Sequence, residues 1–273
     1  MKKYEFTGEV KTYLGKTLHR IKSVVSFGIV VKGEIGGWIE SEKNLSQDGN
    51  AWVYGNADVS GNAWVSGNAR VSGNAEVSGN ARVSGNAWVY GDAWVSGDAW
   101  VYGDAEVSGN ARVSGNARVS GNARVSGNAR VSGNAEVSGN ARVSGDAWVS
   151  GDARVSGDAR VYGNADVSGD AWVSGDAWVY GDARVSGNAW VSGNAWVSGD
   201  AHFMVIGAIG SRFDFTTFFR NKENEISVKC GCFYGTIAEF RAKVTETHGT
   251  DTKFAKVYQA AADLAEMQIE LKK

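Results

Sequence analysis

The chain of 273 residues is long enough for one large or two small domains, and 43% hydrophobic with 21% charged residues is typical of a globular protein. It has 37 glycines but no proline, which excludes collagen, mucin-like stalks and proline-rich linkers. The net charge of −2 gives no reason to expect nucleic acid or an anionic membrane as a partner. With no apolar run of membrane-spanning length and no apolar signal segment behind the first lysines, we expect a cytoplasmic protein with reduced thiols.

Residues 1–50 are predicted to form an N-terminal β cap. The strand-like stretches KYEFTG, KTLHRIKSVV and GIVVKGEIGGWIE are divided by glycine-containing turns, and NLSQDGN leads into the segment that follows. A stack of strands needs such a cap because its unpaired end would otherwise join another chain.

Residues 51–200 consist of 25 hexads without an insertion, with the consensus A-x-V-[S/Y]-G-[N/D]. Position x is Arg 10 times, Trp 10 times, Glu 3 times and Asp twice. Ala and Val alternate with polar or variable residues at period two, which predicts a short strand with Ala and Val inside. Gly followed by Asn or Asp then turns the chain.

A strand of four residues cannot bury its apolar face alone, so successive coils must stack at a spacing of about 4.8 Å. The pattern resembles the hexapeptide-repeat proteins, which place an aliphatic and a small residue four positions apart, as Val53 and Ala57 stand here. The resemblance implies a single-stranded left-handed parallel β-helix with three hexads in each triangular coil. We therefore expect a mainly β protein of about eight coils with a cap at each end.

Residues 201–273 are predicted to form a small α+β module. The stretch AHFMVIGAIGS is followed by RFDFTTFFR and EISVKCGCFYG, which are two strands around the turn NKEN. Thr236 and Glu239 form a capping-box pattern before a helix that Gly249 ends, and a second helix begins at about Thr252. The two cysteines, Cys230 and Cys232, are expected on one face of a strand as small buried residues, although their role stays open.

An 18-residue coil places the x residues in three outward rows, one of which also collects four of the five tyrosines of the repeat. One interpretation of the row is a ladder of stacked rings and guanidinium groups that stabilises the coils. The other is a contact surface for a second copy of the chain, a protein partner, or a small anionic or aromatic ligand such as a nucleotide. The candidate residues of this row are Trp52, Tyr54, Trp88, Tyr90, Arg124, Arg142, Arg160, Tyr162, Trp178, Tyr180 and Trp196.

The charge of the repeat disfavours extended nucleic acid, because 10 arginines face 15 acidic residues. One stretch is locally basic and leaves a small anionic ligand open as a partner. It contains Arg112, Arg118, Arg124 and Arg130, and the corners around it are asparagines.

Catalytic residues are not evident. Hexapeptide acyltransferases need a histidine at the coil surface, and carbonic anhydrases of that fold need three histidine ligands for zinc, whereas residues 51–200 contain no histidine. His19, His202 and His248 are interpreted as structural, so we expect no enzyme activity, metal or cofactor. An acyltransferase-like enzyme is the alternative. The turn GAIGSR has amides for an anion but lacks the lysine and helix of a phosphate loop.

The flanks resemble an uncharacterised bacterial and prophage group of hexapeptide-repeat proteins. The similar segments are TLHRIKSVVSFGIVVKGEIGGWIESEKNLSQDGNAWV, IGSRFDFTTFF and VKCGCFYGTIAEF. This resemblance implies a non-enzymatic β-helical scaffold or binding protein, phage-derived in origin. It would act in the bacterial cytoplasm, or in the virion if a phage encodes it. Shared fold alone says little about activity.

Overall fold

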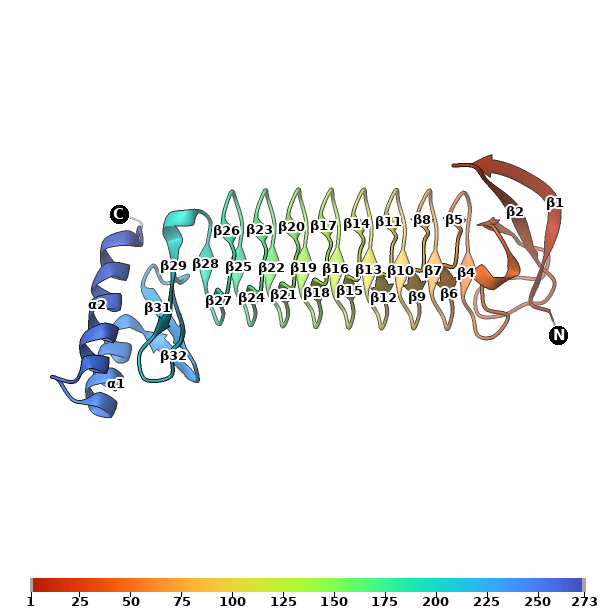
Figure 1. The fold of residues 1–273 in the computed structure, drawn as a ribbon. Coiled ribbons are helices and arrows are strands. Elements are labelled where there is room, and N and C mark those ends of the chain that lie inside the picture. Colours follow the sequence, from red (N-terminus) through yellow and green to blue (C-terminus); the bar gives the residue numbers. More distant parts are fainter. Residues whose placement is uncertain (1, 272–273) are drawn as a thin grey trace. The chain divides into compact units, whose positions relative to one another are not determined.

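The computed structural model describes residues 2–271, and the chain divides into two compact units, residues 1–146 and 147–273, which are described separately (Figure 1). None of the helices within residues 2–271 has the length and apolar content that crossing a membrane requires.

The repeat in the first unit forms three parallel sheets in which each strand pairs with the strand 18 residues further on, as Val53 pairs with Val71. The strands are β4 (Trp52–Val53), β5 (Asp58–Val59), β6 (Trp64–Val65), β7 (Arg70–Val71), β8 (Glu76–Val77), β9 (Arg82–Val83), β10 (Trp88–Val89), β11 (Trp94–Val95), β12 (Trp100–Val101), β13 (Glu106–Val107), β14 (Arg112–Val113), β15 (Arg118–Val119), β16 (Arg124–Val125), β17 (Arg130–Val131), β18 (Glu136–Val137) and β19 (Arg142–Val143). Every third strand lies in the same sheet, which confirms the 18-residue coil.

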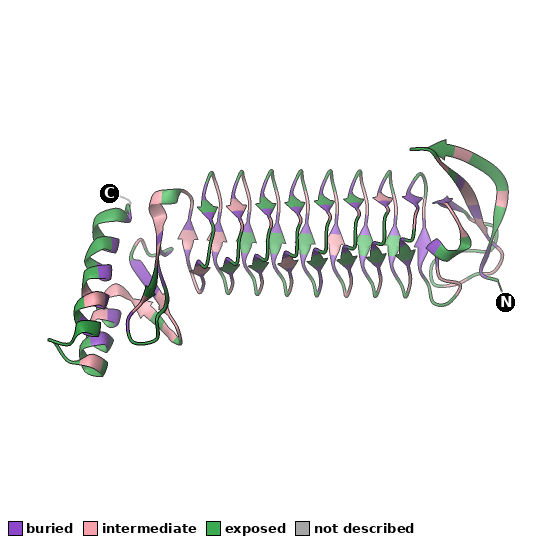
Figure 2. Cartoon of the chain, in the orientation of Figure 1, coloured by how far each residue is buried: buried purple, intermediate pink, exposed green. Residues whose placement is uncertain are grey.

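Ala and Val of every hexad point inward and are at most 1% exposed, as predicted from their alternation with polar residues. Exposed residues gather at the corners (Figure 2). Gly55 through Gly193 at these corners have φ between 60° and 74°, which favours glycine. A Cβ on Gly67 would also lie 3.1 Å from the backbone nitrogen of Gly85 in the next coil, so two constraints select glycine there.

The corner asparagines form side-chain ladders along the coils. Each Asn Nδ2 donates to the carboxamide or carboxylate oxygen 18 residues further on, as Asn68 does to Asn86 at 3.0 Å and Asn74 to Asp92 at 3.0 Å. A carboxylate has no hydrogen to donate. Asp at a corner therefore accepts from the preceding coil and ends that run of hydrogen bonds.

The N-terminal segment forms β1 (Tyr4–Tyr13), β2 (Lys16–Ser23), β3 (Ile35–Ile39) and the short helix η1 (Glu42–Asn44). The first two strands form an antiparallel hairpin with an irregularity between Phe6 and Val10. Strand β3 pairs antiparallel with β2 and parallel with β5, where Ile39 faces Val59. The cap therefore extends one sheet of the solenoid. Of the predicted strand GIVVKGEIGGWIE only Ile35–Ile39 is a strand, since Phe27 and Val30 close a tight bridge before it.

The repeat in the second unit has the same three-sheet coil. Its strands are β20 (Trp148–Val149), β21 (Arg154–Val155), β22 (Arg160–Val161), β23 (Asp166–Val167), β24 (Trp172–Val173), β25 (Trp178–Val179), β26 (Arg184–Val185), β27 (Trp190–Val191) and β28 (Trp196–Val197), and the short helix η2 (Asp200–His202) follows. Sheets β20-β23-β26, β21-β24-β27 and β22-β25-β28 are parallel.

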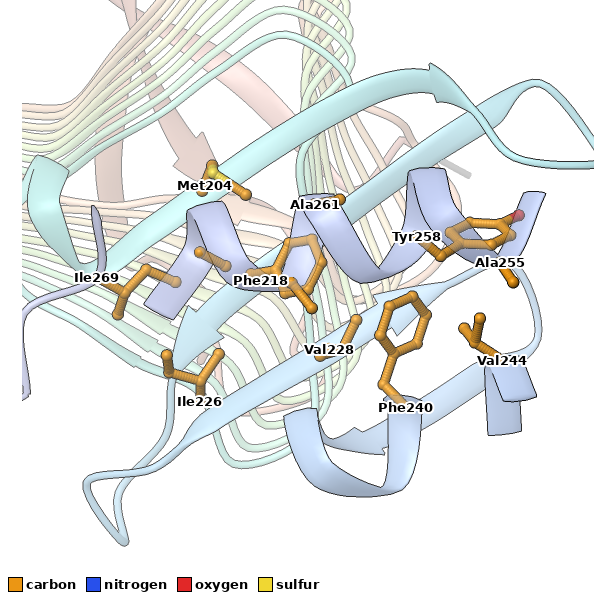
Figure 3. Close-up of a cluster of buried hydrophobic side chains, with 12 residues drawn as sticks. Met204, Phe218, Ile226, Val228, Phe240, Val244, Ala255, Tyr258, Ala261 and Ile269 are labelled. Atoms are coloured by element: carbon orange, nitrogen blue, oxygen red, sulfur yellow. The ribbon is translucent and has the colours of Figure 1, made fainter. Parts of the chain in front are cut away.

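The C-terminal module is an antiparallel sheet of four strands in chain order, covered by two helices. Its elements are β29 (Phe203–Ile209), β30 (Asp214–Arg220), β31 (Ile226–Cys230), β32 (Phe233–Thr236), α1 (Ile237–His248) and α2 (Lys253–Gln268). Phe218 and Val228 of the sheet pack against Phe240 of α1 and Ala262 of α2 in one apolar core, part of which is shown in Figure 3.

Both helices of the module start where the sequence predicts. Thr236 and Glu239 form the predicted capping box of α1, and the Thr252 side chain accepts from the amide of Ala255 at the start of α2. The prediction for the cysteines is wrong. Cys232 is exposed and lies beyond the end of β31, because the chain turns at Gly231 with φ 57°, and Cys230 is only half-buried.

Candidate binding surface

Tryptophans surround the coils of the first unit rather than following one face. Trp88, Trp94 and Trp100 lie on three different sheets of one coil and are 38%, 38% and 37% exposed. Each indole N–H donates to a serine hydroxyl 16 residues earlier, at 3.0, 3.2 and 3.3 Å respectively. The outward serine of the hexad is thus an acceptor that ties consecutive coils together. The sequence carried this signal as a fixed spacing between Ser and Trp, and sequence analysis missed it.

The predicted aromatic row is interrupted in the first unit, where Trp52 corrects the expected facing. Its position points away from the coil interior, yet the side chain is completely buried because Tyr4 and Phe27 of the cap cover it at ring-centroid distances of 6.2 and 5.5 Å. Trp52 is therefore part of the cap core and is closed to a partner. The next aromatic pair of this row, Trp88 and Tyr90, stands by itself at 4.4 Å.

Between these aromatic positions and the end of the first unit the row is charged. Arg124 and Arg142 face each other in register on β16 and β19, and Arg124 also lies 3.5 Å from the carboxylate of Glu106. Tyr54 is half-buried. The structure thus leaves the candidate residues of this unit as separate groups.

In the second unit the same row is continuous. Arg160, Tyr162, Trp178, Tyr180 and Trp196 come together on sheet β22-β25-β28, and we name these five residues the aromatic surface. The phenol rings of Tyr162 and Tyr180 stack at 5.1 Å with an angle of 8° between their planes. The Arg160 guanidinium lies 4.8 Å above the ring of Trp178. Trp196 completes the group, 5.8 Å from Trp178 and 6.1 Å from Tyr180.

The aromatic surface differs from the other tryptophan positions because tyrosines replace the serines that would accept from its indoles. Tyr162 stands 16 residues before Trp178, and Tyr180 stands 16 residues before Trp196. Ring contacts at 6.1 Å take the place of the indole–serine hydrogen bond in both pairs. All four rings are half-buried, and Arg160 is exposed. The rings therefore hold one another and present a rigid face of large aromatic area.

The phenol groups of this surface remain protonated near neutral pH. Burial raises the pKa of Tyr162 above its ordinary value, the neighbouring Tyr180 raises it further, and the Arg160 guanidinium acts in the opposite direction. Tyrosine hydroxyls can consequently donate hydrogen bonds to an acceptor that approaches from solvent.

A neighbouring sheet shows what a simple ladder looks like. Trp172 and Trp190 stack at 4.8 Å with an angle of only 5° between their planes, and their indoles donate to Ser156 and Ser174 at 3.1 and 3.4 Å. The Lys229 ammonium covers the Trp190 ring at 4.0 Å. The polar and ring faces of this pair are used within the unit, so it fits the ladder interpretation.

The locally basic stretch of the repeat faces carboxylates. Arg112 and Arg130 share a groove of about 600 Å³ with Glu76, Asp92 and Asp146. Arg112 also lies 5.6 Å from the ring of Trp94. The mixed charge of this groove gives little preference for an anion.

The three histidines take part in packing within their own units. His19 stacks on Phe6 at 4.7 Å, and His202 lies between Ser198 and Arg220. His248 stacks on Tyr258 at 5.7 Å. Within residues 2–271, no three His, Cys, Asp or Glu side chains gather as a set of metal ligands.

Comparison with known families agrees with this architecture. A family model described as YdcK beta solenoid repeat matches ten stretches of the chain, at residues 75–91, 105–121, 111–125, 117–133, 123–137, 135–151, 153–167, 159–175, 177–193 and 183–199. The chain is a repeat β-solenoid protein. The matches lie within the hexads, so the similarity of this β-solenoid is carried by its coils. No curated protein matches the chain.

Proposed function

We propose that this β-solenoid protein is a non-enzymatic scaffold that binds another protein through its aromatic surface, with a second copy of the chain as the first partner to test. The observation that carries the proposal is the contiguous group of four rings and one guanidinium on sheet β22-β25-β28. Trp, Tyr and Arg are the residue types that most often dominate the energy of protein interfaces.

The rigidity of the coil supports this role. Val161, Val179 and Val197 beneath the surface are fully buried, and the strands that present the rings are held by parallel pairing. Side chains already fixed by packing lose little conformational entropy when a partner covers them. Aromatic groups on a rigid sheet can therefore contribute more affinity than the same groups on a loop.

The non-enzymatic part of the proposal rests on the residues that a catalyst would need. The repeat contains no histidine, and the three histidines of the flanks contact neighbouring side chains in the caps. We extend the proposal to a hexapeptide-repeat protein of phage origin, in the bacterial cytoplasm or in a virion, because the flanks resemble the bacterial and prophage group described above.

The test removes two rings of the aromatic surface by Trp178→Ser together with Tyr180→Ser. Because both positions lie outside the coil interior, circular dichroism should stay as in the parent, while self-association or partner affinity falls about 100-fold or more. Sedimentation velocity measures the native mass against the 29.0 kDa chain. Pull-down with the purified parent and variant measures partner binding.

The matched control is Trp100→Ser together with Tyr102→Ser, which removes the same residue pair from a different sheet, where the rings lie 4.8 Å apart. This control should associate like the parent. Equal native mass and equal binding in parent and Trp178→Ser/Tyr180→Ser would show that the rings only pack on one another. Quenching of tryptophan fluorescence by a nucleotide in a monomeric parent, lost in the double variant, would replace the protein partner by a small aromatic anion.

A further inference from the structure

The C-terminal module contains a cavity of about 490 Å³ that is separate from the aromatic surface. Its walls come from the loop at residues 211–214, the turn at Gly231 and Cys232, the second half of α1, and Tyr258 of α2. A volume of this size is within the range of small-molecule sites, about 300–1,000 Å³.

The floor of the cavity is apolar and aromatic. Phe240, Val244 and Tyr258 belong to the core of the module and lie together at one end of it (Figure 3). The rings of Phe233 and Tyr258 contact Phe240 at centroid distances of 5.5 and 5.7 Å, the latter edge to face. A rigid floor of this kind suits a flat apolar group.

A line of polar atoms crosses this floor. The Tyr258 side chain, only 6% exposed, interacts through its hydroxyl with Ser211 and Cys230, and the Thr216 hydroxyl donates to the Cys230 sulfur at 3.1 Å. Gly210 lets the tyrosine ring come this close, since a Cβ there would lie 1.9 Å from the Tyr258 hydroxyl oxygen. The cavity thus holds a fixed phenol at its base.

The rim carries more positive than negative groups. Arg212, Lys243 and His248 line the cavity with a single carboxylate, Asp214. Lys243 is paired with Glu246 at 2.9 Å, whereas Arg212 forms no ion pair with any residue of the described chain from 2 to 271. Its Nη1 atom lies near Gly231, where even an added Cβ would be 3.5 Å away, so the guanidinium has open space beside it.

We propose that this cavity binds a small, largely apolar organic anion, such as an aromatic carboxylate or sulfonate. Its apolar body lies on Phe240 and Val244, and its anionic group meets the guanidinium of Arg212, which matches such groups with two parallel hydrogen bonds. The site is independent of the proposed protein contact at the aromatic surface.

The probe is 8-anilinonaphthalene-1-sulfonate, whose fluorescence rises on transfer to an apolar site, and its neutral relative N-phenyl-1-naphthylamine lacks only the sulfonate. Titrated against the full chain, the anion should bind at one site per chain. Arg212→Ala should weaken it about tenfold or more, because a hydrogen bond to a charged group is lost. Arg212→Lys should weaken it less, and Lys256→Ala, an exposed cation of α2 outside the cavity, should leave it unchanged.

A second variant tests the cavity without reference to charge. Thr247 is exposed on α1 and lines the cavity, so Thr247→Trp should fill the space and abolish binding of both probes while circular dichroism stays unchanged. Equal affinity of the anion for the parent and for Arg212→Ala, or undiminished binding to Thr247→Trp, would overturn the proposal. Trp178→Ser with Tyr180→Ser should leave probe binding intact, and loss of binding in that variant would place the probe on the aromatic surface instead.

Discussion

At its first coil the repeat is covered by hydrogen-bond donors, whereas at its last coil it is covered by acceptors. The ladder explains the difference: the amides of the outward residues donate toward the next coil, as Trp52 N does to Ala69 O at 3.0 Å. The first coil therefore leaves carbonyl groups unpaired, and the last coil leaves amide groups unpaired. Each end needs a cap of opposite hydrogen-bonding character, because buried backbone groups without partners are costly.

The N-terminal cap supplies its donors from both side chains and backbone. Asn44 Nδ2 donates to the carbonyls of Gly61 and Ala63, both at 2.9 Å, and Lys3 Nζ donates to the carbonyl of Ala51 at 2.9 Å. The amides of Trp38 and Glu40 and of neighbouring cap residues complete the set.

The C-terminal cap supplies oxygen and nitrogen acceptors instead. Thr217 Oγ1 accepts from the amide of Trp190 at 2.9 Å, and Asp200 Oδ1 accepts from that of Arg184 at 3.0 Å. His202 Nδ1 accepts from the amide of Ser198 at 3.1 Å. The comparison teaches that a solenoid cap is chosen by the direction of the ladder as well as by apolar fit.

The strongest way to break the comparison is Asn44→Leu. The Asn44 side chain is fully buried, and its loss leaves two carbonyls without their donor, so we expect a decrease of about 3 kcal/mol in the free energy of unfolding. Urea unfolding followed by tryptophan fluorescence measures it. Asn62→Leu is the control, because Asn62 is an exposed corner residue whose amide donates only to Asn80. Equal losses in the two variants would contradict the donor role of Asn44.

Thr217→Val probes the acceptor side, and its neighbour offers a matched control. Both Thr216 and Thr217 are buried, but only Thr217 accepts from the last coil, whereas Thr216 donates to a sulfur. Leaving the Trp190 amide without an acceptor should cost about 2 kcal/mol, and Thr216→Val should cost less than about 1 kcal/mol. Thermal unfolding of the two variants compares them. A larger loss in Thr216→Val would refute the acceptor role.

The smallest expected effect sharpens the electrostatic side of the comparison. Burial lowers the pKa of Lys3 from 10.5 to about 8, while Asp48 acts in the opposite direction. Between these two values the unfolded chain binds more protons, so the free energy of unfolding should rise with pH, by at most about 1 kcal/mol between pH 8 and pH 9. Lys3→Met should remove this rise. The check is urea unfolding at several pH values, and identical pH profiles of parent and variant would count against a strained buried ammonium.

The repeat made most of the fold predictable from sequence. The period-two alternation of Ala and Val fixes which residues face inward, and the capping residues Thr236 and Thr252 mark the helix starts, because each of these signals acts over a few residues. Part of the aromatic surface was predictable for the same reason, since the coil length alone aligns Trp178 with Trp196.

What sequence analysis missed depends on contacts between distant segments. Burial of Trp52 requires Tyr4 and Phe27 to fold over the first coil, which no local pattern reveals. The acceptor role of Thr217 depends on where β30 meets the end of the repeat, and the cavity beside Arg212 depends on how α1 and α2 meet the sheet. Hydrophobic periodicity carries no information on such placements.

The three-sheet arrangement of the coil also determines how such a chain can change its length. Gain or loss of one hexad would shift every later residue to the adjacent face, so a tryptophan would no longer follow its serine in the neighbouring coil and a row of like residues would be divided between two sides. Gain or loss of 18 residues would return each later residue to its own face. Recombination within the repeated text is therefore tolerated best in steps of three hexads, which lets the β-solenoid vary in extent while its side-chain rows and its two caps keep their alignment.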